Sequence, residues 1–432
     1  MVAYPRWLLL TILACAVLPG CGRTHVTSGE PGEICLADPS GGLPIDEVIR
    51  EHQSLARKLP QKPDQWVLVG RGWVRKARRT GDPGFYVNVD ACAGESLRVA
   101  PENIPGLQLR ALVLMNDHKF EEARKIGDAI LSRQPQDTIA LGTVSDALLE
   151  LGQFEQAAEF TQRMVTARPD MASYSRASYF RWLQGDNATA KAFIRDALKA
   201  GRDPRDPEPT AWSFVQAGML FFNEGDYEGA DAVFAEALKW VADYPAALVG
   251  RGRVALAQNQ PARAIELLTK AYDLNPLPET AWLLGDAREM SGDPTGARSD
   301  YANVVRDGKR SDKLTLAYFY ASKNRDRDEA VRLIEEERTS RRGIYVEDAY
   351  AWTLFRAGRL NEAREASDRA TRLGTRDARL LYHAGAIRLA QGDPGGRALV
   401  EQALAINAKF DWTGAREASA LLNARPRTES TP

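Results

Sequence analysis

The sequence has few of the residues from which metal centres and covalent catalytic sites are built. It contains four histidines and four cysteines in 432 residues. His25, His52, His118 and His383 stand far apart, so no HExxH-type zinc motif is present. There is also no GxSxG nucleophile elbow and no Walker loop. We therefore expect no enzyme activity, no metal and no cofactor.

An excess of one charge and long apolar runs are missing as well. The formal net charge is −1 with 27% charged residues, so no basic field would attract nucleic acid. Beyond the N-terminal segment, no apolar run is long enough to cross a membrane. Alanine, leucine, arginine and glutamate are frequent, whereas alternating β-branched runs are scarce. This composition predicts an all-α protein.

Residues 1–20 have the character of an export signal. Arg6 precedes an apolar stretch over residues 7–18 that is too short for a spanning helix. The stretch ends in LPGC at residues 18–21, which resembles the bacterial lipobox, although proline is unusual at its position. The resemblance implies cleavage before Cys21, acylation of Cys21 and anchoring in the cell envelope. Gly22 favours an outer membrane facing the periplasm, and an ordinary secretory signal is the alternative.

Residues 21–44 contain many glycine, proline and serine residues and are predicted to form a lipid-anchored flexible tether. Removal of the signal and acylation of Cys21 would leave Cys35 and Cys92. A pair of cysteines in an oxidising compartment favours a disulfide. It would join the tether to the first hairpin and contribute about 4 kcal/mol. Two unlinked thiols are the alternative.

A turn followed by a small residue recurs along most of the chain. The anchor alanines are Ala123, Ala157, Ala190, Ala230, Ala264, Ala297, Ala330 and Ala363, and Arg397 takes the place in a further copy. The steps are 33 or 34 residues, except for 40 between Ala190 and Ala230. Twelve positions before the anchor lie Gly218, Gly252, Gly285 and Gly385, and twelve after it lie Pro135, Pro169 and Pro276. Such regularity predicts a repeat architecture.

The residue types suit hairpins of two antiparallel helices. Glycine or asparagine in the turn accepts a left-handed backbone, small residues let the helices approach, and proline ends the second helix. The pattern resembles the tetratricopeptide repeat over roughly residues 64–412. The resemblance implies a right-handed superhelical solenoid of about ten helical hairpins with capping helices at both ends.

This interpretation divides the chain into several parts. We expect an N-terminal capping helix over 45–63, a first half of the array over 64–204, and a second half with a C-terminal capping helix over 205–425. Residues 426–432 are expected to be a disordered tail. The proline-rich loop at 201–209 is interpreted as a hinge between the halves or as a plain surface loop. Arg71, Arg75, Arg78 and Arg79 form a basic stripe that would contact anionic lipid head groups or an acidic patch of a partner, or would remain a solvated face.

First helices of this family line a concave groove, with exposed positions 18, 15, 11, 8 and 7 residues before the anchor. The resemblance therefore implies a protein-binding groove. Its members are Tyr179, Trp182, Trp212, Met219, Phe222, Asn223, Arg253, Trp282, Asp286, Phe319, Tyr345, Trp352, Phe355, Arg356 and Tyr382. Aromatic residues and arginine dominate interface hot spots. Packing of the rings between adjacent hairpins as ordinary core is the alternative.

These features favour a membrane-anchored scaffold or adaptor. Its expected partners are envelope proteins or peptide segments, in envelope assembly, secretion or biogenesis. A glycan-associated envelope protein, holding peptidoglycan or exported polysaccharide, is one alternative. A noncatalytic docking subunit of an enzyme complex is another, because fold alone does not choose a function.

Overall fold

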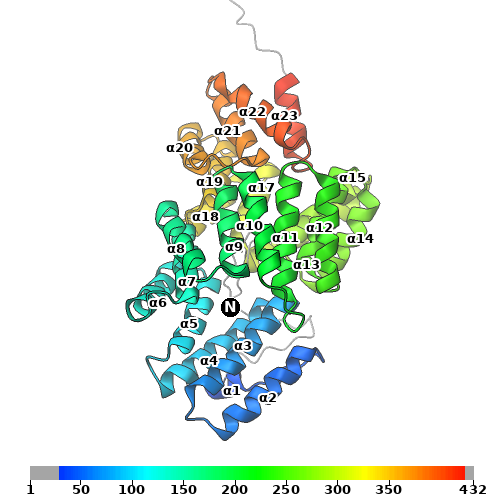
Figure 1. Cartoon of the computed structure of the whole chain (residues 1–432). Helices are drawn as coiled ribbons and strands as arrows, with labels where there is room; N and C mark the ends of the chain where they lie inside the picture. The colour runs from blue at the N-terminus through cyan, green and yellow to red at the C-terminus, as the bar shows by residue number, and fades with distance from the viewer. Residues whose placement is uncertain (1–28, 424–432) are drawn as a thin grey trace, which may run out of the picture. The chain divides into compact units, whose positions relative to one another are not determined.

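The structure, a computed structural model, describes residues 29–423. The export signal, Cys21 and the predicted tail lie outside the described residues. Within 29–423 the chain forms 23 α-helices and one short 3-10 helix, and no strand. From α3 to α22 the helices follow one another as ten pairs (Figure 1). The prediction of an all-α array of helical hairpins is confirmed.

The described chain divides into two compact units. Unit 1 comprises the residues up to Ala177 together with 196–210 and Arg310–Asp312, and α9 is split between the units. The helices that lie wholly or mainly in unit 1 are α1 (Pro31–Cys35), α2 (Pro44–Lys58), α3 (Pro63–Thr80), α4 (Tyr86–Val99), α5 (Ile104–Asn116), α6 (Phe120–Arg133), α7 (Thr138–Glu150), α8 (Phe154–Ala167) and α9 (Met171–Leu183). Residues 196–200, 208–210 and 310–311 also belong to unit 1, although the helices that contain them lie mainly in unit 2.

Unit 2 comprises residues 178–195, Ala211–Lys309 and the chain from Lys313 onward. Its helices are α10 (Asn187–Ala200), α11 (Glu208–Asn223), α12 (Tyr227–Trp240), α13 (Pro245–Ala257), α14 (Pro261–Leu274), α15 (Pro278–Met290) and α16 (Pro294–Ser311). They continue with α17 (Lys313–Ser322), α18 (Arg327–Glu337), α19 (Ile344–Arg356), α20 (Leu360–Thr371), α21 (Ala378–Ala390), α22 (Gly395–Ile406) and α23 (Gly414–Asn423).

The turns and small residues explain why these segments form hairpins. Turn glycines such as Gly152 and Gly225 have φ of 79° and 80°, and His118 takes the same left-handed conformation with φ of 56°. Gly252 allows close packing of helices, because a Cβ atom there would lie 2.6 Å from the side chain of Leu268. Both roles follow from the sequence pattern.

The proline-rich loop at 201–209 contacts the basic stripe of α3. Arg75 Nε lies 3.3 Å from a carboxylate oxygen of Asp206, and Arg78 Nε lies 3.9 Å from one of Glu208. Two of the four arginines of the stripe therefore face acidic groups of this chain. The loop segment 196–210 belongs to unit 1. The proposed division of the array at residues 204 and 205 remains a prediction.

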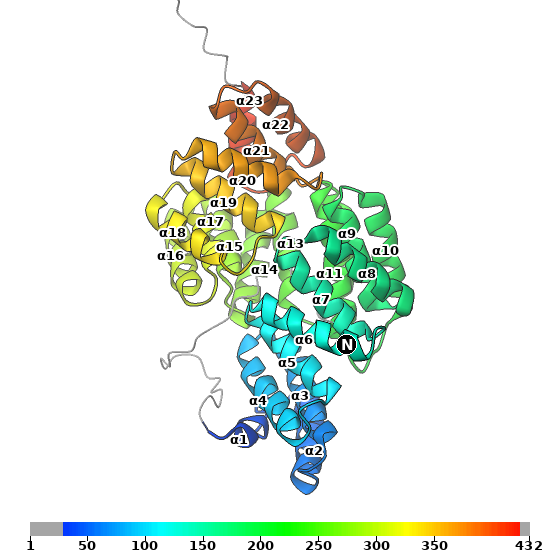
Figure 2. The same ribbon diagram turned by 90° about the vertical axis from the view of Figure 1, so that its left-hand side faces the viewer.

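The N-terminal helices cover the first hairpin. In Figure 2, α1 lies beside α4 and α2 lies beside α3, and these pairs are in contact. Cys35 of α1 and Cys92 of α4 form a disulfide with an S–S distance of 2.05 Å, and both residues are fully buried. The described part of the expected tether therefore differs from a flexible chain, since it is joined covalently to a hydrophobic core that includes Trp66 and Trp73.

Replacing Cys92 with serine is expected to destabilise the first hairpin by about 4 kcal/mol, because the bond closes a loop across 57 residues. Urea unfolding followed by circular dichroism would measure the loss. The wild-type chain unfolded with and without a dithiol reductant provides the control. Equal midpoints for the oxidised and reduced proteins would contradict this contribution.

Candidate functional site

The first helices of consecutive hairpins in unit 2 pack side by side. Helix α13 contacts α15, α15 contacts α17, α17 contacts α19, and α19 contacts α21. This row of helices carries most of the residues predicted to line a groove. Because each first helix lies against the next, a side chain between two of them is covered on both sides.

None of the fifteen predicted groove side chains is exposed. The fully or nearly buried ones are Trp182, Phe222, Asp286, Phe319, Trp352 and Tyr382, each with at most 5% of its surface exposed. The half-buried ones are Tyr179, Trp212, Met219, Asn223, Arg253, Trp282, Tyr345, Phe355 and Arg356. For the first set, packing between hairpins is the role that the structure supports. Partner contact by the second set remains a prediction.

Trp182 is buried because distant hairpins of unit 2 meet. Its indole Nε1 donates a hydrogen bond of 3.0 Å to the Tyr345 hydroxyl, although 163 residues separate the two. One residue further on, the Leu183 carbonyl accepts a hydrogen bond of 2.5 Å from the Thr375 hydroxyl. The turn after α9 therefore lies against the segment that follows α20.

Phe222 is covered in a similar way. The Asn407 amide donates a hydrogen bond of 2.7 Å to the Phe222 carbonyl. The Tyr227 hydroxyl donates one of 2.6 Å to the Asn407 side chain. The turn between α11 and α12 therefore lies against the end of α22. The repeat pattern in the sequence does not predict these contacts, because they join hairpins that are far apart in the chain.

Four half-buried side chains from neighbouring first helices form a cluster in unit 2, which we call the ring face: Trp282 of α15, Tyr318 of α17, Tyr345 of α19 and Arg379 of α21. The rings of Trp282 and Tyr318 have centroids 5.2 Å apart. The Arg379 guanidinium carbon lies 5.1 Å from the Tyr318 ring centroid and 6.0 Å from that of Tyr345. Burial raises the pKa of both tyrosines, so their hydroxyls stay protonated.

Arg379 is the charged member of the ring face. Its Nε lies 4.0 Å from Asp348 and has no hydrogen-bond partner. Asp348 is engaged by His383, whose Nδ1 lies 2.9 Å from it, and the His383 ring stacks on Trp352 at 4.0 Å. The guanidinium therefore lies between aromatic rings and pairs with the Asp348 carboxylate at 4.0 Å without a hydrogen bond from Nε. This environment suits a hydrogen-bond acceptor that packs against the rings.

Our sequence analysis missed Asp348 and Arg379, although the signal was present. Arg379 stands 18 residues before position 397, and Asp348 stands 15 residues before Ala363. The same two offsets selected Tyr345 and Tyr382. At these two offsets the prediction kept the aromatic residue of each helix and omitted the charged one, although it included Arg253, Asp286 and Arg356 elsewhere.

Two further predicted groove residues are occupied by the C-terminal helix. Glu417 of α23 accepts hydrogen bonds from Arg356 at 2.5 Å and from the Tyr382 hydroxyl at 2.7 Å. The Arg356 guanidinium carbon also lies 4.4 Å from the Trp352 ring. Here an aromatic and arginine set serves to attach α23 to the array.

Asp286 lies in a buried polar cluster. It accepts hydrogen bonds of 2.6 Å from the Tyr301 hydroxyl and 2.8 Å from Lys323 Nζ. Burial raises the pKa of Asp286 from 3.8 to about 6, against the opposing effect of Lys323. Burial and the Asp286 carboxylate also raise the pKa of Tyr301. Asp286 therefore has a packing role between α15, α16 and α17.

The raised pKa of Asp286 predicts how stability depends on pH. The folded chain takes up a proton as the pH falls through about 6, whereas the unfolded chain does so only near 3.9. Lowering the pH from 7 to 5 should therefore increase the contribution of this group to the unfolding free energy by roughly 1 kcal/mol. Urea unfolding at both pH values would measure it. In Asp286→Asn this contribution should disappear, and an unchanged slope would contradict the assignment.

The described residues, 29–423, contain no group of three or more histidine, cysteine or acidic side chains placed to hold a metal ion. Across the same residues, no helix has both the length and the apolar character that crossing a bilayer requires.

Comparison with known proteins identifies the repeat. Residues 109–172, 215–279 and 249–312 match the tetratricopeptide repeat family. No curated protein matches the chain. Among solved structures, the type IV pilus biogenesis factor PilW is similar to this chain at 16% identity, with a TM-score of 0.41, over 47% of this chain and 92% of PilW.

Two longer structures are also similar. The human IFIT1 dimer with PPP-AAAA matches at 13% identity and a TM-score of 0.47, over 87% of this chain and 93% of that chain. Yeast Tom70 matches at 14% identity and a TM-score of 0.36, over 88% and 91%. At these identities and scores, the likenesses carry no argument about ligands or partners.

Proposed function

We propose that this chain, in which residues 109–172, 215–279 and 249–312 match the tetratricopeptide repeat family, is a scaffold or adaptor that binds a partner protein at the ring face of unit 2. The observation that carries the proposal is the Arg379 side chain, which packs among the rings of Tyr318 and Tyr345, lies 4.0 Å from Asp348 and keeps 33% of its surface exposed. Half-buried rings beside arginine are the side chains that contribute most at protein interfaces.

The chemistry of the ring face favours a peptide segment as the ligand. A backbone carbonyl or a carboxylate would satisfy Arg379, and apolar side chains would cover the rings of Trp282 and Tyr318. A stretch of protein supplies both kinds of group. A glycan would use the rings but would supply weaker acceptors for the guanidinium.

Replacing Tyr318 or Arg379 with alanine is expected to weaken partner binding by roughly ten- to thirty-fold, as for an interface hot spot. The partner would be identified by crosslinking in the native envelope and its affinity measured by calorimetry. A matched pair on a second helix provides the control, because Arg163 of α8 lies 4.7 Å from the ring of Phe160. Phe160→Ala and Arg163→Ala should bind normally.

Equal losses in the α8 and ring-face variants would contradict a specific ring-face site. So would full binding by Arg379→Ala. Sedimentation with purified peptidoglycan or exported polysaccharide separates the rival ligand class, since a protein scaffold should remain in solution. Circular dichroism melts show whether each variant retains its fold.

We further propose that the protein is attached to the cell envelope through an acylated Cys21, in an outer membrane facing the periplasm where the cell has two membranes. The proposal is supported by the apolar segment at 7–18 and the LPGC sequence that ends at Cys21. The buried Cys35–Cys92 bond also fits an oxidising compartment. Envelope assembly, secretion or biogenesis is the process that such a location favours.

Replacing Cys21 with serine is expected to abolish incorporation of labelled palmitate and to release the protein from the membrane fraction. Stable membrane attachment requires more than one acyl chain. Because Cys21 is the residue predicted to be acylated, its replacement should remove the anchor. Cys15→Ser is the matched control, because Cys15 should leave with the signal peptide. Membrane attachment of Cys21→Ser would contradict the proposed anchor.

A further inference from the structure

Residues 29–43, which we call the strap, are held by side chains of three helices. Six of the seven backbone carbonyls from Ile34 to Ser40 accept a hydrogen bond from α2, α3 or α4. The exception is Asp38, whose side chain accepts a hydrogen bond of 3.2 Å from Arg50. The helices therefore bind the strap backbone at nearly every carbonyl between Ile34 and Ser40.

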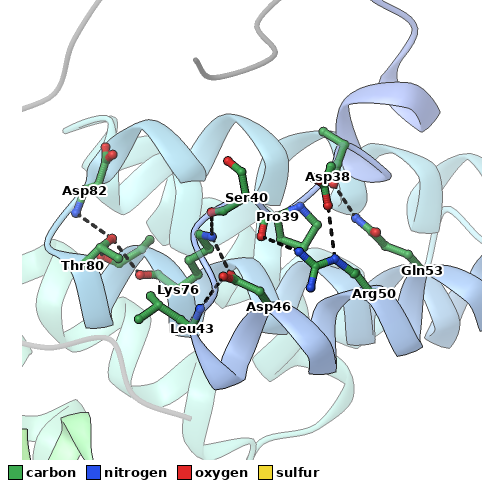
Figure 3. Close-up of polar contacts among 12 residues, drawn as sticks. Asp38, Pro39, Ser40, Leu43, Asp46, Arg50, Gln53, Lys76, Thr80 and Asp82 are labelled. Atoms are coloured by element: carbon green, nitrogen blue, oxygen red, sulfur yellow. Dashed lines mark hydrogen bonds and ion pairs between the residues drawn. The ribbon is translucent and has the colours of Figure 1, made fainter. Parts of the chain in front are cut away.

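The donors form a surface that we call the cradle: Arg50, Gln53 and Arg57 of α2, Trp73 and Lys76 of α3, and Asn88 of α4. Asn88 donates to the Ile34 carbonyl at 2.7 Å, Trp73 to Cys35 at 2.9 Å, Arg57 to Leu36 at 3.1 Å, Gln53 to Ala37 at 2.7 Å and Lys76 to Ser40 at 2.6 Å. Figure 3 shows the Gln53 and Lys76 end of this arrangement beside Asp46 and Arg50.

The cradle residues donate hydrogen bonds to the strap backbone in addition to packing in the core. Gln53, Lys76 and Asn88 each have 2% of their surface exposed. Without the strap, the amides of Gln53 and Asn88 would exchange these hydrogen bonds for hydrogen bonds to water. Lys76 would keep its bond of 2.5 Å to Asp46. The cradle therefore offers the same donors to another segment that presents carbonyls at the positions of the strap.

The strap also contributes side chains and a hinge. Ile34, Leu36 and Ala37 pack against the core of the first hairpin. Gly41 and Gly42, at the end of the strap, have φ of 132° and 73°, which residues with side chains rarely adopt. The chain can turn at these two glycines between the strap and α2.

We propose that the cradle is a docking site for a peptide segment that forms one short helix and continues as a non-helical stretch, filled by the strap of the same chain and locked by the Cys35–Cys92 disulfide. In the oxidised protein the lock keeps the strap in place. In the reduced protein the strap detaches about Gly41 and Gly42, and the vacant cradle binds a segment of the same kind. The preferred ligand has aliphatic residues at the positions of Ile34 and Leu36, because these two side chains pack against the core. The other contacts of the cradle are hydrogen bonds to backbone carbonyls, which any sequence provides.

Unlocking is a two-electron reduction by a dithiol. One thiolate of the dithiol attacks a sulfur of the Cys35–Cys92 bond, which breaks as a mixed disulfide forms. The second thiol of the reductant then displaces the protein sulfur. The products are two protein thiols and one oxidised, cyclic reductant, so electrons and protons balance. Both cysteines have 0% of their surface exposed, so attack requires local opening of the strap.

Cleavage by a glutamate-specific protease tests the lock in the whole chain, because Glu33 lies within the strap. The oxidised protein should resist cleavage after Glu33. The Cys35→Ser/Cys92→Ser protein should be cut there at least about ten-fold faster, while α5 and later helices remain intact. Mass spectrometry of the fragments identifies the site and its rate.

Substitutions in the cradle separate strap release from general loosening. In the Cys35→Ser/Cys92→Ser protein, which we call the serine background, Asn88→Ala should speed cleavage after Glu33 by a further factor of about five. The reason is the loss of one hydrogen bond to the strap. Asp90→Ala on the same helix is the matched control, because Asp90 pairs with Arg110 of α5 instead. Equal effects of both variants would overturn the proposal, as would no change on loss of the disulfide or cleavage throughout the chain.

Binding of a separate peptide tests the vacant site. The whole chain carrying Ile34→Asp and Leu36→Asp in the serine background has a weakened strap and an unchanged cradle. A labelled peptide of residues 30–43 with serine at position 35 should bind it saturably by fluorescence anisotropy. The oxidised wild-type protein should bind at least about ten-fold more weakly, because its strap occupies the cradle. Equal binding by the two proteins, or none by either, would overturn the proposal.

Discussion

Burial of each hairpin against its neighbours is the constraint on which this structure depends. Two helices cannot cover their own apolar faces, so stability comes from stacking hairpin on hairpin. Close stacking requires small residues where the helices touch. At Gly218, an added Cβ atom would lie 2.6 Å from the Phe234 ring. Glycine and alanine therefore occur in the repeat at the positions where the helices pack most closely.

The same constraint explains why aromatic residues became core in unit 2. Rings such as Phe319 and Trp352 lie on first helices that pack side by side, so they are covered by the next first helix. Trp182 is covered by a hairpin distant in sequence, through the Tyr345 hydroxyl. Side chains at the margins of these contacts, such as Tyr318 and Arg379, keep part of their surface exposed.

The ends of an array need a different solution, because a terminal hairpin has no further repeat to cover it. At the C-terminal end, Glu417 of α23 binds Arg356 and the Tyr382 hydroxyl. At the N-terminal end, the buried pair of Lys76 and Asp46 connects α3 to α2, and a disulfide attaches α1. Polar and covalent contacts of this kind specify which segment covers an end, whereas apolar packing alone is less selective.

The amino-acid sequence by itself determined the hairpins, because turn glycines, anchor alanines and terminal prolines act within about 34 residues. It also indicated that Cys35 and Cys92 are the cysteines available for pairing. Only the tertiary structure decided which rings are buried, that Asn407 binds Phe222, and that six carbonyls of the strap are held by the cradle. Those contacts join residues that no local period relates, so they depend on how the stacked hairpins meet in space.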